Sequence, residues 1–160
     1  MIEAAQISSS DEYYGYRFED LEVGMTASYA KTITEADIVL FAGISGDTNP
    51  AHLNQEFAST TMFQGRIAHG MLTASLISAV LGTKLPGPGC IYISQKLRFK
   101  GPVRAGDTIT ARVMITELLP QKRRVVLDTL CMVSGQIVLD GAAEMLIPAR
   151  QRVARMGGMA

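Results

Sequence analysis

Little in this sequence points to nucleic-acid binding, redox chemistry or a disulfide scaffold. Its 160 residues include no Trp and two Cys, and fifteen basic side chains balance fifteen acidic ones. A net charge of zero gives no basic surface for nucleic acid. Cys90 and Cys131 stand alone, without C-x-x-C spacing, so we interpret both as small buried hydrophobic residues.

Long apolar runs are also absent. The longest uncharged stretch, Ile67 to Thr83, contains His69 and several hydroxyl side chains, and it is shorter than the roughly 20 apolar residues that a bilayer span requires. The first twelve residues lack the basic segment and apolar core of a secretory signal. We therefore expect a cytoplasmic protein with no membrane contact.

The length fits a single domain of roughly 150 residues, and no repeat or long linker divides it. The polar start and the Met- and Gly-rich end predict a flexible N-terminal extension at residues 1–15 and a flexible tail at 149–160. The folded domain is then expected over residues 16–148.

Two helices are expected in the first half of the chain. Thr34, with Asp37 three residues later, has the pattern of a helix N-cap and predicts a helix over about 35–44. Residues 68–85 are apolar around nearly the whole helical projection, which predicts a second helix that is buried on several sides.

Strands dominate the second half. Alternating apolar residues predict strands at about 91–99, 108–118, 124–133 and 137–147, and residues 18–33 form an extended lead-in or a further strand, interrupted at Val23-Gly24. Helices followed by antiparallel strands indicate an α+β fold in which one long helix packs on an antiparallel sheet.

Three polar residues cluster where the first helix should end. Asp47, Asn49 and His52 lie within six residues, around Pro50, which cannot continue a helix. In a turn, these side chains can converge on one point and hold a reacting group. The alternative is ordinary turn chemistry, in which Asp47 and Asn49 form an Asx-turn and His52 caps a neighbouring segment.

A second candidate lies at the start of the apolar helix. The first backbone N–H groups of a helix lack intrahelical acceptors and lie at the positive end of its dipole, so the Gly70 N–H could stabilise a developing oxyanion. Close packing of the helix start is the alternative. We interpret His69 as a helix-terminus or core hydrogen-bonding residue. No three ligands have metal-binding spacing and no phosphate-binding glycine loop occurs, so no metal is expected.

Taken together, these segments resemble the signature of a known family. Ser45-Gly-Asp-Thr-Asn-Pro-Ala-His52 and Ile67-Ala-His-Gly-Met-Leu72, with Phe57-Ala58 and Phe63 between them, are similar to the MaoC-like dehydratases, the (R)-specific enoyl-CoA hydratases. The similarity continues into the strands and leaves out both ends of the chain. Ala51 stands where the family often has a larger aliphatic residue.

The resemblance implies a hot-dog fold, in which an antiparallel sheet wraps a long central helix, and a homodimer or dimer of dimers. It implies reversible hydration of trans-2-enoyl-CoA to (R)-3-hydroxyacyl-CoA, with coenzyme A as part of the substrate and no separate cofactor. Asp47 and His52 would hold the water, Gly70 would bind the enolate oxygen, and Asn49 would position the turn or the water.

Helical spacing from Gly70 places Ala74, Ser78 and Leu81 on one face, where they would contact the acyl chain and favour short to medium lengths. Lys84 and Arg98 are candidates for the phosphates of coenzyme A, with a solvated basic surface as the alternative. The (R)-product could feed polyhydroxyalkanoate synthesis, and fatty-acid breakdown is another possible setting.

Other functions fit the same motifs. The chain could dehydrate (R)-3-hydroxyacyl groups on acyl carrier protein, or hydrate a branched or dicarboxylic enoyl-CoA. A non-enzymatic alternative is an acyl-CoA sensor or an assembly subunit. A thioesterase of this fold is disfavoured, because residues 68–85 lack an acidic side chain.

Overall fold

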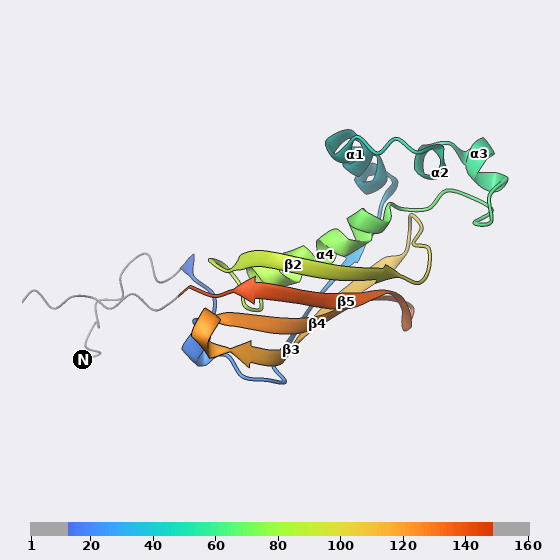
Figure 1. The fold of residues 1–160 in the computed structure, drawn as a ribbon. Helices are drawn as coiled ribbons and strands as arrows, with labels where there is room; N and C mark the ends of the chain where they lie inside the picture. The colour runs from blue at the N-terminus through green and yellow to red at the C-terminus, as the bar shows by residue number, and fades with distance from the viewer. Residues whose placement is uncertain (1–12, 149–160) are drawn as a thin grey trace, which may run out of the picture.

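The computed structural model describes residues 13–148, which fold into one five-stranded antiparallel sheet and four α-helices (Figure 1). The strand order is β1-β3-β4-β5-β2, so β1 and β2 are the two edges. The elements are η2 (Phe18–Asp20), β1 (Thr26–Thr32), α1 (Glu35–Ser45), α2 (Pro50–Leu53), α3 (Gln55–Ser59), α4 (Gly70–Thr83), β2 (Ile91–Phe99), β3 (Thr108–Leu119), η3 (Pro120–Lys122), β4 (Arg124–Val133) and β5 (Gln136–Leu146).

The hydrophobic core lies between the sheet and α4, which contacts β1, β3 and β4. From Ile109 to Ile115, every second side chain of β3 is buried, because alternate residues of a strand point to opposite faces. Half of the residues of α4 are buried: Leu72, Thr73, Ala74, Leu76, Ile77, Val80 and Leu81. The sheet and the central helix therefore have the α+β arrangement that the sequence predicts.

A capping box fixes the start of α1. The Thr34 hydroxyl accepts a hydrogen bond from the Asp37 backbone N–H at 3.2 Å, and the Asp37 carboxylate accepts one from the Thr34 N–H at 2.8 Å. The helix ends at Gly46, whose positive φ of 76° suits a residue without a side chain. The helix is one residue longer than predicted.

In Figure 1, α1 lies above the sheet near the start of α4, and α2 and α3 extend outward from it. The chain leaves α1, turns through residues 46–49, forms the short α2 and α3, and returns to the sheet at the start of α4. Neither α2 nor α3 was predicted from the sequence. Pro50 begins α2, where its missing N–H is harmless, and the Asn49 side chain caps it.

Most strand positions are confirmed to within one residue, and the predicted interruption of segment 18–33 at Val23-Gly24 is a turn. The first part of this segment forms the 3-10 turn η2, and β1 begins at Thr26. Gly15 and Tyr16 donate backbone hydrogen bonds to Pro88 and Pro86, both at 2.8 Å, so ordered contacts begin by Gly15. Most of the predicted N-terminal extension, 1–12, and the predicted tail, 149–160, lie outside the described residues.

Within residues 13–148, no helix is long and apolar enough to cross a membrane.

Candidate active site

The turn between α1 and α2 presents the acidic residue of the candidate site. The Asn49 N–H donates to Asp47 Oδ1 at 3.2 Å, which fixes one carboxylate oxygen. The Asn49 Oδ1 accepts a hydrogen bond from the Ala51 N–H at 3.0 Å and so caps α2. These contacts favour a role for Asn49 in shaping the turn, which is one of the two roles that the sequence suggested.

His52 lies in α2 with its ring turned toward Asp47. Its Nδ1 lies 2.8 Å from the carbonyl oxygen of Ile67. Because a carbonyl only accepts hydrogen bonds, Nδ1 carries the proton, and Nε2 of the neutral ring presents a lone pair. This Nε2 lies 4.0 Å from Asp47 Oδ2. That separation is too long for a direct hydrogen bond and leaves room for a small ligand that contacts both atoms.

The two members of the pair differ in their exposure. The His52 side chain is 11% exposed, whereas the Asp47 side chain is 52% exposed. The histidine is therefore held inside the protein, while the carboxylate lies at the solvent-accessible side.

His52 and Gly70 share one cavity of about 390 Å³. Its wall is mainly apolar and includes Phe99, Thr73 and Val138. The ring of Phe99 packs over Gly70 so closely that a Cβ at position 70 would lie 2.8 Å from Phe99 Cε1. Gly70 therefore does pack closely against Phe99. This packing is compatible with a role of its backbone N–H in binding an oxyanion.

The Gly70 N–H lies at the start of α4, where the N-cap His69 makes no side-chain capping hydrogen bond. N–H groups of a first helical turn have no intrahelical acceptor, and they lie at the positive end of the helix dipole. The cavity therefore combines a ring nitrogen that accepts a proton with a backbone site suited to negative charge.

Three residues with metal-ligand chemistry also meet here. Ligand-type atoms of Asp47, His52 and His69 lie within 4.8 Å of one another, although their sequence spacing gave no sign of it. The two imidazole rings are stacked, however, with centroids 3.9 Å apart and planes inclined by 33°. Lone pairs lie in the ring planes, so stacked rings do not aim both nitrogens at one point about 2.1 Å away, as a zinc ion needs. The geometry does not suit a metal.

The five predicted substrate contacts do not all lie near this cavity. Ala74 and Ser78 line a second groove, between α4 and β2, with Phe41, Met71 and Tyr92 on its other walls. Leu81 is fully buried in the core, because the sheet closes over α4 toward its C-terminal end. It therefore does not reach either opening.

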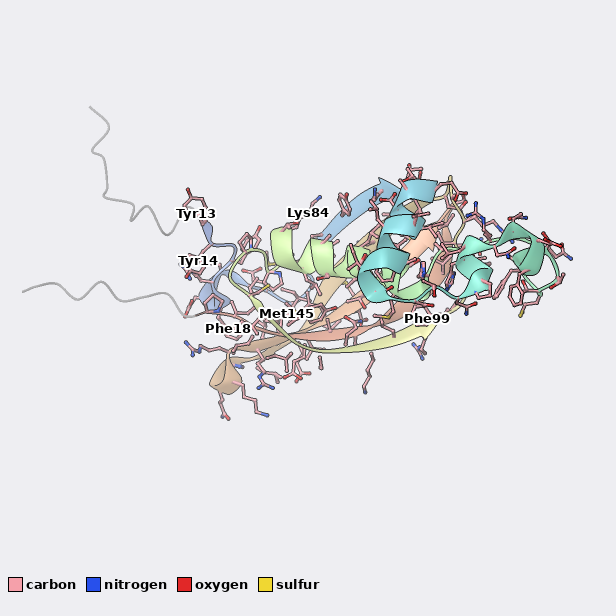
Figure 2. All side chains as sticks on the ribbon, turned by 90° about the horizontal axis from the view of Figure 1, so that it is seen from above. Tyr13, Tyr14, Phe18, Lys84, Phe99 and Met145 are labelled. Atoms are coloured by element: carbon pink, nitrogen blue, oxygen red, sulfur yellow. The ribbon has the colours of Figure 1, made fainter. Side chains whose placement is uncertain are left out.

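Lys84 lies at the far end of α4 from Gly70. Figure 2 shows it well separated from Phe99 along the molecule. Its Nζ donates to the Ser28 carbonyl at 2.7 Å and lies 5.8 Å from the centre of the Tyr29 ring. In this arrangement, Lys84 covers the edge of β1 and is remote from the cavity. A helical projection identifies a face of a helix but not which of its ends lies at the site.

Arg98 is exposed on β2 and pairs with Asp140 at 2.9 Å. Lys100, which lines the cavity, pairs with the same carboxylate. The hydrogen bond from Lys100, aided by that from Arg98, holds the pKa of Asp140 below its usual range. Lys100 is thus a basic residue at the wall of the cavity, already paired with Asp140.

Sequence reasoning missed several wall residues, among them Thr73 and Phe99. Both lie in elements that were predicted correctly, but their position at the cavity depends on how the end of β2 meets the start of α4. No local pattern carries that information.

Comparison with known proteins gives the family. The sequence model of the family described as the MaoC like domain matches residues 19–138. An (R)-specific enoyl-CoA hydratase of Rhodospirillum rubrum is 57% identical over 142 residues, covering 89% of this chain and 99% of that protein. A 3-hydroxybutyryl-CoA dehydratase of Methylorubrum extorquens is 52% identical, covering 88% of this chain and 92% of that protein.

Solved structures agree with the sequence comparison. The unliganded R-hydratase PhaJ1 of Pseudomonas aeruginosa is 43% identical and superposes with a TM-score of 0.80, covering 91% of this chain and 96% of that one. The antiparallel sheet wrapped around α4 is the hot-dog fold. With its motifs, its fold and three quarters of its length matched, the chain belongs to the MaoC-like domain family.

Proposed function

We propose that this protein catalyses the reversible addition of water to trans-2-enoyl-CoA, giving (R)-3-hydroxyacyl-CoA with short to medium acyl chains. The observation that carries the proposal is the pair formed by Asp47 Oδ2 and His52 Nε2, 4.0 Å apart, beside a cavity that also contains Gly70. The identity to a named (R)-specific enoyl-CoA hydratase supports the same reaction.

The reacting water binds between the two side chains. His52 Nε2 accepts one proton of the water while the water oxygen forms a bond to C3 of the enoyl group. Asp47 Oδ2 accepts a hydrogen bond from the second O–H of the water, and that proton stays on the oxygen. The pair then delivers one proton to C2 on the same face, so it returns to its starting state. Acid–base help of this kind contributes about 10²- to 10⁴-fold to the rate.

The hydrogen bond from Nδ1 to Ile67 supports His52 as the base. It keeps the proton on Nδ1 and directs the lone pair of Nε2 toward Asp47. Asp47 serves as the relay, with its Oδ1 fixed by the Asn49 N–H.

The thioester oxygen takes on negative charge as C3 is attacked. In the proposed complex it accepts a hydrogen bond from the Gly70 N–H, at the positive end of α4. Losing one such donor typically costs about 3 kcal/mol of transition-state stabilisation. Phe99 and Val138 provide a largely apolar wall, in which this hydrogen bond is stronger than in water.

The reaction needs no cofactor in this scheme, because water, base and oxyanion donor suffice. Prolonged treatment with a metal chelator should leave the rate unchanged. A loss of activity that zinc or another divalent ion restores would contradict this part of the proposal.

The acyl chain is assigned to the groove between α4 and β2, where Ala74 and Ser78 leave space. Between Met71 and Ser78 the groove follows about two helical turns, or ~10 Å, which suits short to medium chains. One side of this groove is open in a single chain.

A second copy is proposed to close it. β2 pairs with β5 on one side, and its side chains Ile91, Ile93 and Phe99 are 56%, 40% and 53% exposed. An edge strand that exposes apolar side chains in this way is a template for pairing with another chain. At the other edge of the sheet, the Lys84 ammonium covers the Ser28 carbonyl of β1. We therefore assign the homodimer contact to β2.

The decisive experiment measures the loss of the enoyl ultraviolet absorbance with crotonyl-CoA and identifies the product by chiral analysis. Wild type should give (R)-3-hydroxybutyryl-CoA, and folded Asp47→Ala and His52→Ala variants should lose at least about 10²-fold in kcat. The same acyl group on acyl carrier protein is the comparison substrate. No turnover of either substrate by folded wild type would refute the proposal, and a faster rate on the carrier protein would replace coenzyme A as the substrate carrier.

A further inference from the structure

His69 contacts both members of the proposed catalytic pair, although it belongs to neither. It is 1% exposed and is the N-cap residue of α4, directly before Gly70. Its Nε2 donates to the backbone carbonyl of Asp47 at 2.9 Å, across 22 residues of sequence. Its ring stacks on that of His52, with centroids 3.9 Å apart.

The burial of this ring is unusual in one respect. Among residues 13–148, His69 Nδ1 is the only buried side-chain nitrogen or oxygen without a hydrogen-bond partner. Leaving such an atom unpaired typically costs about 1 to 3 kcal/mol. An apolar ring could fill the same space between His52 and Phe41 without that penalty. The advantage of a histidine at position 69 therefore lies in its paired atom, Nε2, and the hydrogen bond from that atom to Asp47.

That contact joins two parts of the site that are otherwise far apart in the chain. Asp47 follows Gly46, the left-handed residue that ends α1, and lies in the turn that leads to α2. His69 is joined covalently to Gly70, which begins the central helix. Through one side chain, the acidic residue, the base and the proposed oxyanion donor are held relative to one another.

We propose that His69 is a positioning residue that sets the separation of Asp47 Oδ2 and His52 Nε2. The hydrogen bond fixes the backbone of the acidic residue, and the stacked ring limits rotation of the base. The expected effect on kcat rests on the proposed hydratase function. The contacts of His69 with Asp47 and His52 are present without substrate.

Two substitutions separate the two contacts. His69→Gln keeps an N–H donor for the Asp47 carbonyl but removes the stacked ring. His69→Phe keeps a ring against His52 but removes the donor. Because misplacement of reacting groups by about 1 Å can cost 10²-fold, we expect His69→Phe to lower kcat by about that factor with little change in KM. His69→Gln should recover part of this loss.

Loss of stability alone is the competing explanation, and a matched control addresses it. Leu85 is 2% exposed and lies just beyond the opposite end of α4. Leu85→Ala should lower the thermal midpoint as a buried Leu→Ala change does, yet keep kcat within about twofold of wild type. A kcat that falls equally in Leu85→Ala would overturn the positioning role.

A readout independent of turnover is available because the chain contains two histidines, His52 and His69. The imidazole ¹⁵N spectrum of the untagged protein should show His52 in one tautomer, protonated at Nδ1. In His69→Phe, the His52 signals should shift and broaden, whereas in Leu85→Ala they should stay as in wild type. Unchanged His52 signals in His69→Phe, or unchanged kcat in an active protein, would overturn the inference. An inactive wild type with the expected spectrum would refute the hydratase function and leave the positioning geometry standing.

Discussion

Gly70 and Phe99 form a complementary pair, because the ring of one occupies the space that a side chain on the other would need. A Cβ at position 70 would lie 2.8 Å from Phe99 Cε1. Phe99 is 53% exposed, so its ring can shift toward solvent, but the wall of the cavity would shift with it.

Gly70→Ala should therefore lower kcat more than it lowers stability. We expect a loss of about 10²-fold in kcat, because the Ala side chain displaces Phe99 and disturbs the oxyanion site. Steady-state kinetics and thermal unfolding of the same preparation measure the two effects. The double variant Gly70→Ala/Phe99→Leu removes the collision and should regain part of the rate, whereas no rescue would mean that Phe99 is not the cause.

The reactivity of the Cys131 thiol tests whether this residue lies in the core. Burial raises the pKa of Cys131 to about 12, and burial also raises that of Cys90. Thiolate is the reactive form, so folded protein at pH 8 should react slowly with iodoacetamide at both positions. Mass spectrometry should find rapid labelling after denaturation. Fast labelling of Cys131 in native protein would contradict its place in the core.

The proximity of Asp47 and His52, whose Oδ2 and Nε2 lie 4.0 Å apart, could be predicted because the two residues are close in the chain. Asp47, Asn49 and His52 lie in the turn and the short helix α2 that follow the end of α1 at Ser45. The contact between His69 and Asp47 spans 22 residues and could not be read from spacing. The sequence correctly indicated a hydrogen-bonding role for His69 but not its partner.

Among the helices, α1 carries the clearest link between charge and structure. Hydrogen bonds from the Thr34 backbone and hydroxyl, helped by Lys31, lower the pKa of Asp37. A carboxylate with a lowered folded pKa stabilises the protein above its unfolded pKa of about 3.9, and this contribution is lost as the pH falls through the folded pKa.

Asp37→Asn should thus destabilise the protein at pH 7 by about 0.5 kcal/mol, through loss of a charge at the helix N-terminus. The difference from wild type should shrink at an acid pH below the lowered folded pKa of Asp37, where both side chains are neutral. Urea unfolding at both pH values measures this. An equal difference at the two pH values would show that the charge of Asp37 is not responsible.

Gly141 in β5 and Gly82 in α4 differ in the space that a side chain would have. A Cβ on Gly141 of β5 would lie 1.8 Å from the Lys96 carbonyl of β2, whereas one on Gly82 of α4 would meet nothing within 4 Å. Gly141→Ala should separate β5 from β2 and cost about 3 kcal/mol, as overpacking does. Gly82→Ala should gain up to about 1 kcal/mol from helix propensity. Denaturant unfolding compares them, and a stable Gly141→Ala would show that β2 can move.

Element prediction was accurate for long periodic segments and poor for short ones. The helix start at Glu35 and the strand 124–133 were predicted correctly. The short α2 and α3 were missed, since four or five residues carry no period, although Asn49-Pro50 is a usable N-cap and N1 signal. In β1 the extended pattern began too early, because residues 18–20 turn instead of extending.

For the whole molecule, the proposed dimer gives the most direct test. Ile93 on the free edge of β2 and Met114 on β3 are 40% and 39% exposed. Ile93→Lys should shift sedimentation from dimer to monomer and lower kcat, because the open groove loses its second wall. Met114→Lys, matched in exposure, should change neither. A fully active monomer would contradict the assignment of the groove.

Some whole-molecule features could not be predicted from the sequence. The α+β class and the order of elements followed from periodicity, and the family resemblance supplied the hot-dog closure. Which end of α4 lies at the site did not follow, so Lys84 was placed with the substrate although it covers the Ser28 carbonyl at the other end. Arg98, in turn, is held by Asp140 on the surface.

Both histidines of the site are anchored to main-chain carbonyls, His52 to that of Ile67 and His69 to that of Asp47. Every amino acid carries such a carbonyl, so the anchors persist whatever side chain occupies positions 47 and 67. These two hydrogen bonds therefore do not depend on which reactive side chain stands at position 47. A descendant of this chain could exchange its acidic residue for another, and so change its chemistry, while inheriting the same scaffold intact.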